Sequence, residues 1–273
     1  MQERKIELTV KEYNRCGEFL ERTLRLDTYP LAVKWFEPGE PLPEKAIRPM
    51  RDLGKHMAFC QAKAMARMRG MTIAMAKQDH WCWNPLISFG MVDCRKGTPE
   101  FEIIKKYIGV PPEKADDFLE AFPRLELGKY EYVVVSPLKD AEFEPDMILI
   151  YSNTMQLNCI LRAVKMMTGT YLKSEFDCID SCTYCTVPPY YSGEYRITVP
   201  DPGDVERARA GKDEMIFSVP PKRLQELCTG LENMEKRGLD YRGARLCMPL
   251  DFERPPFYNE IFEMWGLDKG EDW

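Results

Sequence analysis

The sequence has only two histidines among its 273 residues, His56 and His80. Structural zinc sites often combine cysteines with paired histidines, so this scarcity argues against such a site. No apolar run approaches the roughly 18 residues that predict a membrane span. The charged N-terminal residues lack the apolar segment of a signal peptide. We therefore expect a cytoplasmic protein without a membrane partner.

A concentrated positive charge is also missing. The formal net charge is −6, and the 38 Lys and Arg residues are spread along the chain rather than gathered in a stripe. Binding to a phosphate backbone requires such a stripe, so we expect no nucleic-acid partner. Hydrophobic residues make up 44% of the chain and charged residues 30%, a balance typical of a folded globular protein.

Cysteine, by contrast, is plentiful, with 10 in the chain. In a reducing cytoplasm they are expected to be thiols or metal ligands. Three of them, Cys178, Cys182 and Cys185, form a C-x3-C-x2-C pattern among acidic and hydroxyl residues, which does not suit core packing. Thiolates are the usual ligands of iron–sulfur clusters. The spacing resembles the cluster loop of radical S-adenosylmethionine enzymes, but too few residues follow Cys185 to build their barrel.

Further ligands must come from elsewhere in the chain. Cys60 precedes a predicted helix, where exposed backbone amides favour a thiolate. Cys82 lies between Trp81 and Trp83. Additional candidates are Cys94, Cys247 and Asp201. The alternative to an iron–sulfur cluster is zinc, held by cysteines with or without His80.

Hydrophobic periodicity predicts a mixed α/β fold of the α+β class. The predicted strands cover residues 31–36, 71–76, 130–136, 146–151, 170–176, 194–198 and 214–219. The predicted helices cover residues 9–24, 58–69, 154–168 and 222–234, with further helix within 98–127. We expect one domain over residues 1–235, followed by a Pro- and aromatic-rich C-terminal arm over residues 236–273.

The order of these elements contains a faint repeat, with halves at about 10–127 and 128–235. Each half has a strand, a helix that ends at a glycine, a second strand, and then a cysteine. If an internal duplication produced the two halves, their strand–helix–strand units would pack around a shared cysteine site. This alignment pairs Cys82 with Cys182 across a pseudo-twofold axis, with Cys60 in support.

Several segments together resemble the uncharacterised ArCR family of archaea and bacteria. They include Tyr29–Lys34, Cys60-Gln61, the Cys82 loop and Phe143–Ile150, and they continue to Phe217–Pro220. The resemblance covers roughly residues 10–235. It implies cysteines at positions such as Cys60, Cys82 and Cys182, and often one near Asp201. It implies no reaction.

We therefore expect an iron–sulfur protein, with a 4Fe–4S cluster, that acts in anaerobic metabolism. Under the enzyme hypothesis, the protein does redox or lyase chemistry on a small acid, which can be aromatic. His80 and Lys34 are the catalytic candidates. Residues expected to line the cofactor are Trp81, Trp83 and Tyr184. The alternatives are a non-catalytic electron-transfer, redox-sensing or accessory subunit, and a structural zinc–thiolate protein. Expected partners are a small-molecule substrate or a redox partner protein, in a homo-oligomer or as a subunit of a complex.

Overall fold

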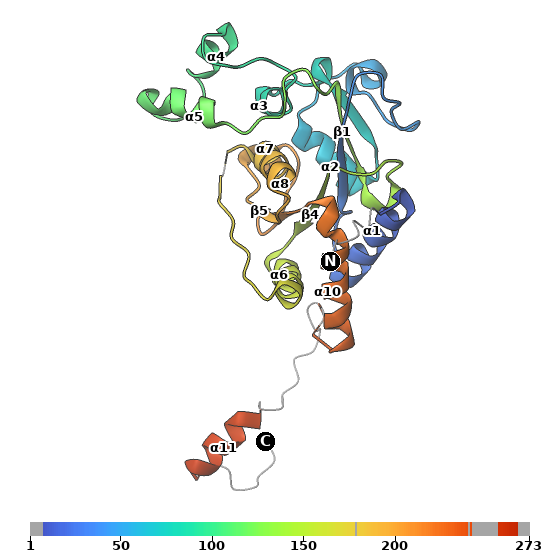
Figure 1. Cartoon of the computed structure of the whole chain (residues 1–273), viewed down its shortest axis with the longest axis vertical. Helices are drawn as coiled ribbons and strands as arrows, with labels where there is room; N and C mark the ends of the chain where they lie inside the picture. The colour runs from blue at the N-terminus through green and yellow to red at the C-terminus, as the bar shows by residue number, and fades with distance from the viewer. Residues whose placement is uncertain (1–7, 178, 240, 242–255, 267–273) are drawn as a thin grey trace, which may run out of the picture. The chain divides into compact units, whose positions relative to one another are not determined.

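The structure is a computed structural model that describes residues 8–177, 179–239, 241 and 256–266 (Figure 1). The chain forms two compact units, Met1–Tyr241 and Arg242–Trp273. The described part of the second unit contains one helix, α11 (Pro256–Met264). Cys178 and Cys247 lie outside the described residues.

The first unit contains a six-stranded antiparallel sheet in its described part, with strand order β2-β3-β1-β4-β6-β5. The strands are β1 (Leu31–Phe36), β2 (Ile73–Ala76), β3 (Tyr132–Pro137), β4 (Met147–Ser152), β5 (Arg196–Thr198) and β6 (Met215–Val219). The order is the same when read outward from the central β1–β4 pair: the first strand of each half is innermost, the third comes next, and the second is at the edge. The mixed α/β class is confirmed.

The α-helices of the first unit precede, separate and follow these strands, and two stretches carry three helices in a row. They are α1 (Val10–Leu24), α2 (Phe59–Arg69), α3 (Trp83–Ser88), α4 (Pro99–Ile104), α5 (Ala115–Ala121), α6 (Thr154–Thr168), α7 (Ser181–Tyr184), α8 (Val187–Ser192), α9 (Pro202–Glu206) and α10 (Leu224–Lys236). The residues predicted to cap the long helices lie at the helix ends, as expected. The Thr9 backbone N–H and hydroxyl both donate to Glu12 at the start of α1, and Gly169 ends α6 with a positive φ of 69°.

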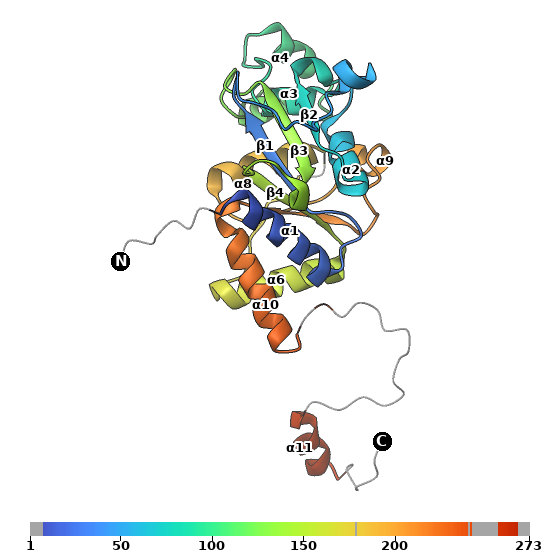
Figure 2. The ribbon, with the colours of Figure 1, turned by 90° about the vertical axis from the view of Figure 1, so that its right-hand side faces the viewer.

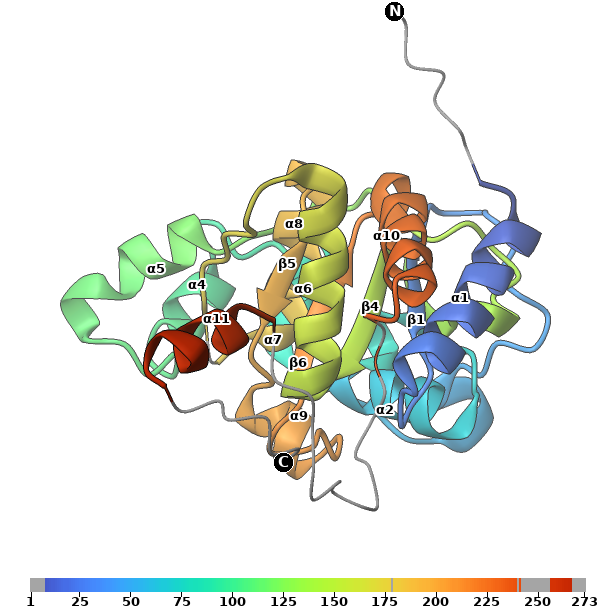
Figure 3. The ribbon, with the colours of Figure 1, turned by 90° about the horizontal axis from the view of Figure 1, so that it is seen from below.

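The two faces of the sheet carry separate cores because side chains alternate along each strand. Figure 3 shows α6, α10 and α1 side by side in front of the sheet, and their buried side chains pack on one of its faces. Figure 2 shows α2 and α9 close together, away from that row of helices. The side chains of α2 and α7 pack on the opposite face, together with Leu31, Val33 and Trp35 of β1. We call this second side the cysteine face, since Cys60, Cys182 and Cys185 are buried there.

Two sequence predictions need correction. Residues 170–176 form no strand. The hydroxyl of Ser174 instead donates to the carbonyl of Ile197 (2.8 Å) and accepts from its N–H (3.1 Å), so one side chain replaces a backbone ladder at the edge of β5. The repeat as aligned from sequence equates α2 with α6, but these helices lie on opposite faces of the sheet. A twofold axis that relates the antiparallel neighbours β1 and β4 leaves corresponding helices on the same face of the sheet. The alignment of α2 with α6 is therefore wrong.

Candidate functional site

Cys60 and Cys182 form the centre of the site. Cys60 is the second residue of α2, and Cys182 is the second residue of α7. Their thiols are hydrogen-bonded to each other although 122 positions separate them in the chain. This contact lowers the pKa of Cys60, while the same contact and burial hold the pKa of Cys182 well above its usual value. Cys60 is therefore the thiol of the pair that ionises first.

Cys82 and Asp201 lie beside this pair, and each is the N-cap residue of a short helix, α3 and α9 respectively. The thiol of Cys82 interacts electrostatically with Cys60 and Asp201, and burial raises its pKa to about 11. Asp201 accepts hydrogen bonds from the Asp204 N–H (2.8 Å), the Ser181 N–H (3.0 Å) and the Ser181 hydroxyl (2.9 Å). An ionised carboxylate has about four acceptor positions, so one lone pair of Asp201 is left for another partner.

A buried ion pair between α2 and α9 lies close to the thiols. The ammonium of Lys63 lies 3.1 Å from Asp204, and both side chains are at most 1% exposed. Asp204 also accepts from the Tyr151 hydroxyl (2.9 Å) and from Ser181. Complete burial alone lowers the pKa of Lys63, but attraction to Asp204 and to Cys182 outweighs it, and the net pKa is well above the usual value. Lys63 is thus a permanent positive charge close to the thiols.

A second polar network ties α3 to α7. The amide of Asn84 donates to Asp180 and accepts from the Thr183 hydroxyl, and all three side chains are buried. The other carboxylate oxygen of Asp180 is buried without a hydrogen-bond partner among the described residues. Burial, with repulsion from Asp177, raises the pKa of Asp180 to about 7. An unpartnered buried oxygen is costly, which points to a ligand or solvent group at this position.

The remaining predicted site residues are less directly involved. The Cys185 thiol donates to the carbonyl of Cys182 (3.7 Å), and burial raises its pKa to about 12. Lys34 alternates with Val33 and Trp35, so it lies on the face away from the cysteines; it pairs with Glu40 at 3.7 Å. The structure does not bring Lys34 to the thiols.

His80, Trp81 and Trp83 flank Cys82 in sequence, but these residues and Tyr184 have separate neighbours in the fold. Trp81 is 46% exposed and donates to Gln61 at 3.2 Å. Trp83 and Tyr184 both contact the ring of Phe122. His80 is buried, neither ring nitrogen has a partner in the described part of the chain, and burial lowers its pKa to about 3. His80 is therefore neutral at physiological pH.

Sequence analysis missed Lys63, Asp204, Asp180 and Asn84. The first two carried a weak signal: Lys63 lies one turn after Cys60 on the predicted helix, and Asp204 follows Asp201 by three residues. Both side chains are buried in the fold. Asp180 and Asn84 had none, because their pairing joins segments 96 residues apart.

The donor set suits a thiolate metal centre in its chemistry. Soft metals and iron–sulfur clusters take cysteine thiolates, and a carboxylate can complete the set. Across the described ranges, no three His, Cys, Asp or Glu side chains are arranged to hold one metal ion. Gly203 keeps one side of the site open: a Cβ added there would lie 3.0 Å from Asp201 Oδ1 and 3.7 Å from Cys60 Sγ.

Comparison with known proteins shows the family of this chain. The family model described as Uncharacterised ArCR matches residues 19–230, a span that includes all four residues Cys60, Cys82, Cys182 and Asp201. The chain belongs to the ArCR family. An uncharacterised protein of Methanocaldococcus jannaschii is 22% identical over 235 residues, which cover 84% of this chain and 97% of that relative. No solved structure matches the ArCR chain. No helix in the described residues combines the length and the apolar character needed to cross a membrane.

Proposed function

We propose that this ArCR protein binds an iron–sulfur cluster of the 4Fe–4S type through Cys60, Cys82 and Cys182, with Asp201 as the fourth ligand. The observation that carries the proposal is the hydrogen-bonded pair of Cys60 and Cys182, with Cys82 and Asp201 close enough to interact electrostatically with Cys60. The four residues come from four separate chain segments. Three thiols and one carboxylate around a buried, largely apolar surface match the ligand chemistry of such clusters.

An internal duplication explains why these four positions meet. The strand order has the symmetry of two three-stranded halves joined at β1 and β4. We align α2 with α7, since both lie on the cysteine face between the first and second strands of their halves. Cys60 and Cys182 then occupy the same place, the second residue of a helix. Cys82 and Asp201 also match, each as the N-cap of the helix after the second strand.

This alignment makes Asp201 the substitute for a fourth thiol. A carboxylate binds iron less tightly than a thiolate, and a site with three thiolates has one coordination position open to exchange. When bound, the cluster would supply either electron transfer or a Lewis-acidic iron at that position. This feature supports the enzyme hypothesis of redox or lyase chemistry on a small acid in anaerobic metabolism, in a cytoplasmic protein.

The protein's own residues can prepare such a site. Lys63 contributes a fixed positive charge that stabilises thiolates at Cys60 and Cys182. Ser181 holds Asp201 with two hydrogen bonds and so keeps its carboxylate beside the thiols. The unpartnered oxygen of Asp180 is available to accept a hydrogen bond from a substrate hydroxyl or acid group. We do not assign Lys34 a role, because it lies on the other face.

Zinc is the second candidate, and one contact favours it. Tetrahedral zinc with Zn–S bonds of about 2.3 Å holds two thiolate sulfurs roughly 3.8 Å apart, which is close to a hydrogen-bonded thiol pair. The Cys60–Cys182 contact is of this kind. A zinc site would make the protein a structural or accessory subunit.

Metal and sulfide analysis separates the two candidates. The protein is purified without oxygen, and its iron, acid-labile sulfide and zinc are measured per chain, with an electron paramagnetic resonance spectrum of the reduced form. We expect about four irons and four sulfides, and a spectrum that changes when a small carboxylate is added. Stoichiometric zinc in a colourless protein would exclude the iron–sulfur proposal. Iron with a spectrum insensitive to carboxylates would favour the electron-transfer alternative.

The ligand set is tested by substitution. Cys60→Ser, Cys82→Ser and Cys182→Ser should each lower the iron content. Cys94→Ser should not, because Cys94 is buried in a separate hydrophobic core. Asp201→Cys should retain the cluster and slow its loss to a chelator, because a thiolate replaces the weaker ligand. Equal iron in all variants would show that the cluster lies elsewhere.

A further inference from the structure

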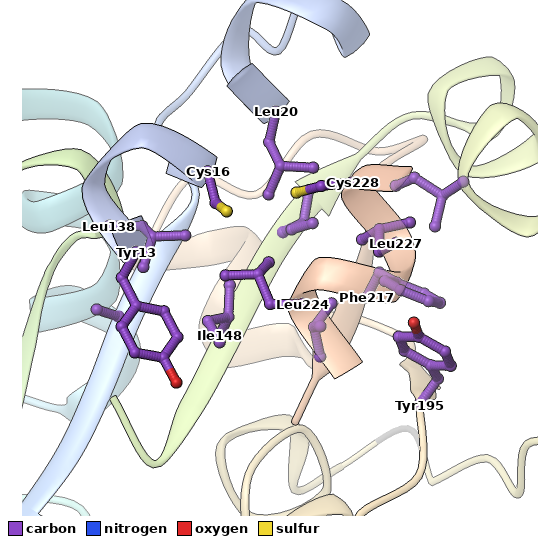
Figure 4. Close-up of a cluster of buried hydrophobic side chains, with 14 of the residues drawn as sticks. Tyr13, Cys16, Leu20, Leu138, Ile148, Tyr195, Phe217, Leu224, Leu227 and Cys228 are labelled. Atoms are coloured by element: carbon purple, nitrogen blue, oxygen red, sulfur yellow. The ribbon is translucent and has the colours of Figure 1, made fainter. Parts of the chain in front are cut away.

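A second pair of thiols lies on the opposite face of the sheet from the proposed cluster. Cys16 belongs to α1 and Cys228 to α10, the first and last helices of the first unit. Figure 4 shows their two sulfur atoms turned toward each other between the helices, among Leu20, Leu224 and Leu227. The two thiols are hydrogen-bonded to each other, so the sulfurs need little movement to come within bonding distance.

The backbone fixes this arrangement on both sides. Gly17, beside Cys16, lies so close to the chain at Lys139 that a Cβ would come within 2.7 Å of its backbone nitrogen. A Cβ added at Gly230, two residues after Cys228, would likewise lie 2.7 Å from the carbonyl oxygen of Ala163 in α6. Each helix is therefore seated against a neighbouring element at a distance that only glycine permits. The facing of the two thiols follows from helix positions that cannot easily change.

The two thiols also differ in pKa, and a stepwise oxidation requires one thiol that ionises before the other. The hydrogen bond from Cys228 lowers the pKa of Cys16, while the same bond raises the pKa of Cys228. Glu12 and Glu232 are the charged groups that act on this pair, and both oppose the thiolate form. Cys16 is 9% exposed and Cys228 3%, so Cys16 is the more exposed residue as well as the one whose thiol ionises first.

We propose that Cys16 and Cys228 are a reversible modification site, which forms a disulfide by exchange with low-molecular-weight disulfides. In the first step the Cys16 thiolate attacks one sulfur of the small disulfide, whose S–S bond breaks and releases one small thiolate. In the second step the Cys228 thiolate attacks the Cys16 sulfur and displaces the second small thiolate. The two cysteines lose two electrons and two protons in total, and the small disulfide takes them up as two thiols.

The product would join the two ends of the first unit. The bond closes a loop that contains every strand of the sheet, since α1 precedes β1 and α10 follows β6. A cross-link of such long range removes much of the freedom of the unfolded chain. Oxidation would thus stabilise the fold without a change in the cysteine face.

Peptide mapping of the oxidised full-length protein tests this proposal. The protein is incubated with glutathione disulfide, its remaining thiols are alkylated, and the digest is analysed by mass spectrometry without reduction. We expect a Cys16–Cys228 cross-linked peptide that dithiothreitol removes, and a rise in melting temperature of roughly 5 to 15 °C on oxidation. Cys16→Ser and Cys228→Ser should abolish both effects, and Cys94→Ser neither.

Other outcomes have a clear meaning. Alkylation of both Cys16 and Cys228 after prolonged exposure to the oxidant would overturn the proposal, as would a cross-link of either residue to a different cysteine. If a serine variant does not fold, the wild-type peptide map and the alanine variants decide the question. Cys60→Ser should lose the proposed cluster yet still form the Cys16–Cys228 bond, so failure of one proposal is distinguishable from failure of the other.

Discussion

Removal of the Lys63 charge should destabilise the protein far more than removal of a surface charge. Lys63 is fully buried and its ammonium lies 3.1 Å from Asp204, which is 1% exposed. Lys63→Met keeps much of the side-chain volume but leaves the Asp204 carboxylate buried without its cation. Breaking a buried pair in this way costs about 3 to 5 kcal/mol, because the remaining charge is uncompensated. For a unit of this size we expect a melting temperature lower by roughly 6 to 20 °C.

The matched variants make this prediction specific. Urea denaturation of Lys63→Met, Asp204→Asn and the double variant measures the free energy of unfolding of each. The double variant should lose less than Lys63→Met alone, since no unpaired charge remains in it. Arg95→Ala, which breaks the exposed pair with Asp93, should cost less than about 1 kcal/mol. A loss below about 1 kcal/mol in Lys63→Met would refute the buried-pair account.

Three further substitutions follow from the structure. Burial raises the pKa of Asp146, so this residue contributes stability below its unfolded-state pKa, and that contribution is lost as the pH rises through its folded-state pKa. In Asp146→Asn the urea midpoint should no longer fall over this pH range, and a pH profile equal to that of wild type would contradict the prediction. Gly203→Ala places a Cβ 3.0 Å from Asp201 Oδ1 and should lower metal retention in a chelator assay, whereas full retention would argue against Asp201 as a ligand. Gly230→Ala should cost about 1 to 3 kcal/mol on thermal unfolding, because its Cβ would meet the Ala163 carbonyl at 2.7 Å; the stabilisation usual for Gly→Ala in a helix would contradict that contact.

Most of the secondary structure could be predicted from periodicity and capping residues. The α6 helix has the predicted bounds, and β1 matches its predicted strand, because both have strong apolar patterns between clear end signals. The strand prediction for residues 170–176 was wrong although their apolar and polar residues alternate. The segment is held beside β5 by the Ser174 side chain rather than by backbone strand pairing. The assignment of helices to faces was also out of reach, since both faces of the sheet are apolar and covered.

The candidate site was predictable in its residue types rather than in its pairings. Cysteines 60, 82 and 182 were expected at one site, and the structure brings Cys60 and Cys182 into contact beside Cys82. The direct partner of Cys182 is Cys60, whereas the sequence repeat paired it with Cys82. Local spacing suggested a compact Cys178–Cys185 loop, but Cys185 bonds within its own segment. Long-range pairing depends on sheet topology, which local patterns do not encode.

The central proposal is that one iron–sulfur cluster is held by Cys60, Cys82, Cys182 and Asp201. The most direct test is the iron and sulfide content of anaerobically purified Cys182→Ser beside wild type and Cys94→Ser. We predict close to four irons and four sulfides per chain in wild type and Cys94→Ser, with a loss of most of both in Cys182→Ser. Wild-type protein that carries zinc in place of iron, or Cys182→Ser that keeps its full iron content, would contradict the claim.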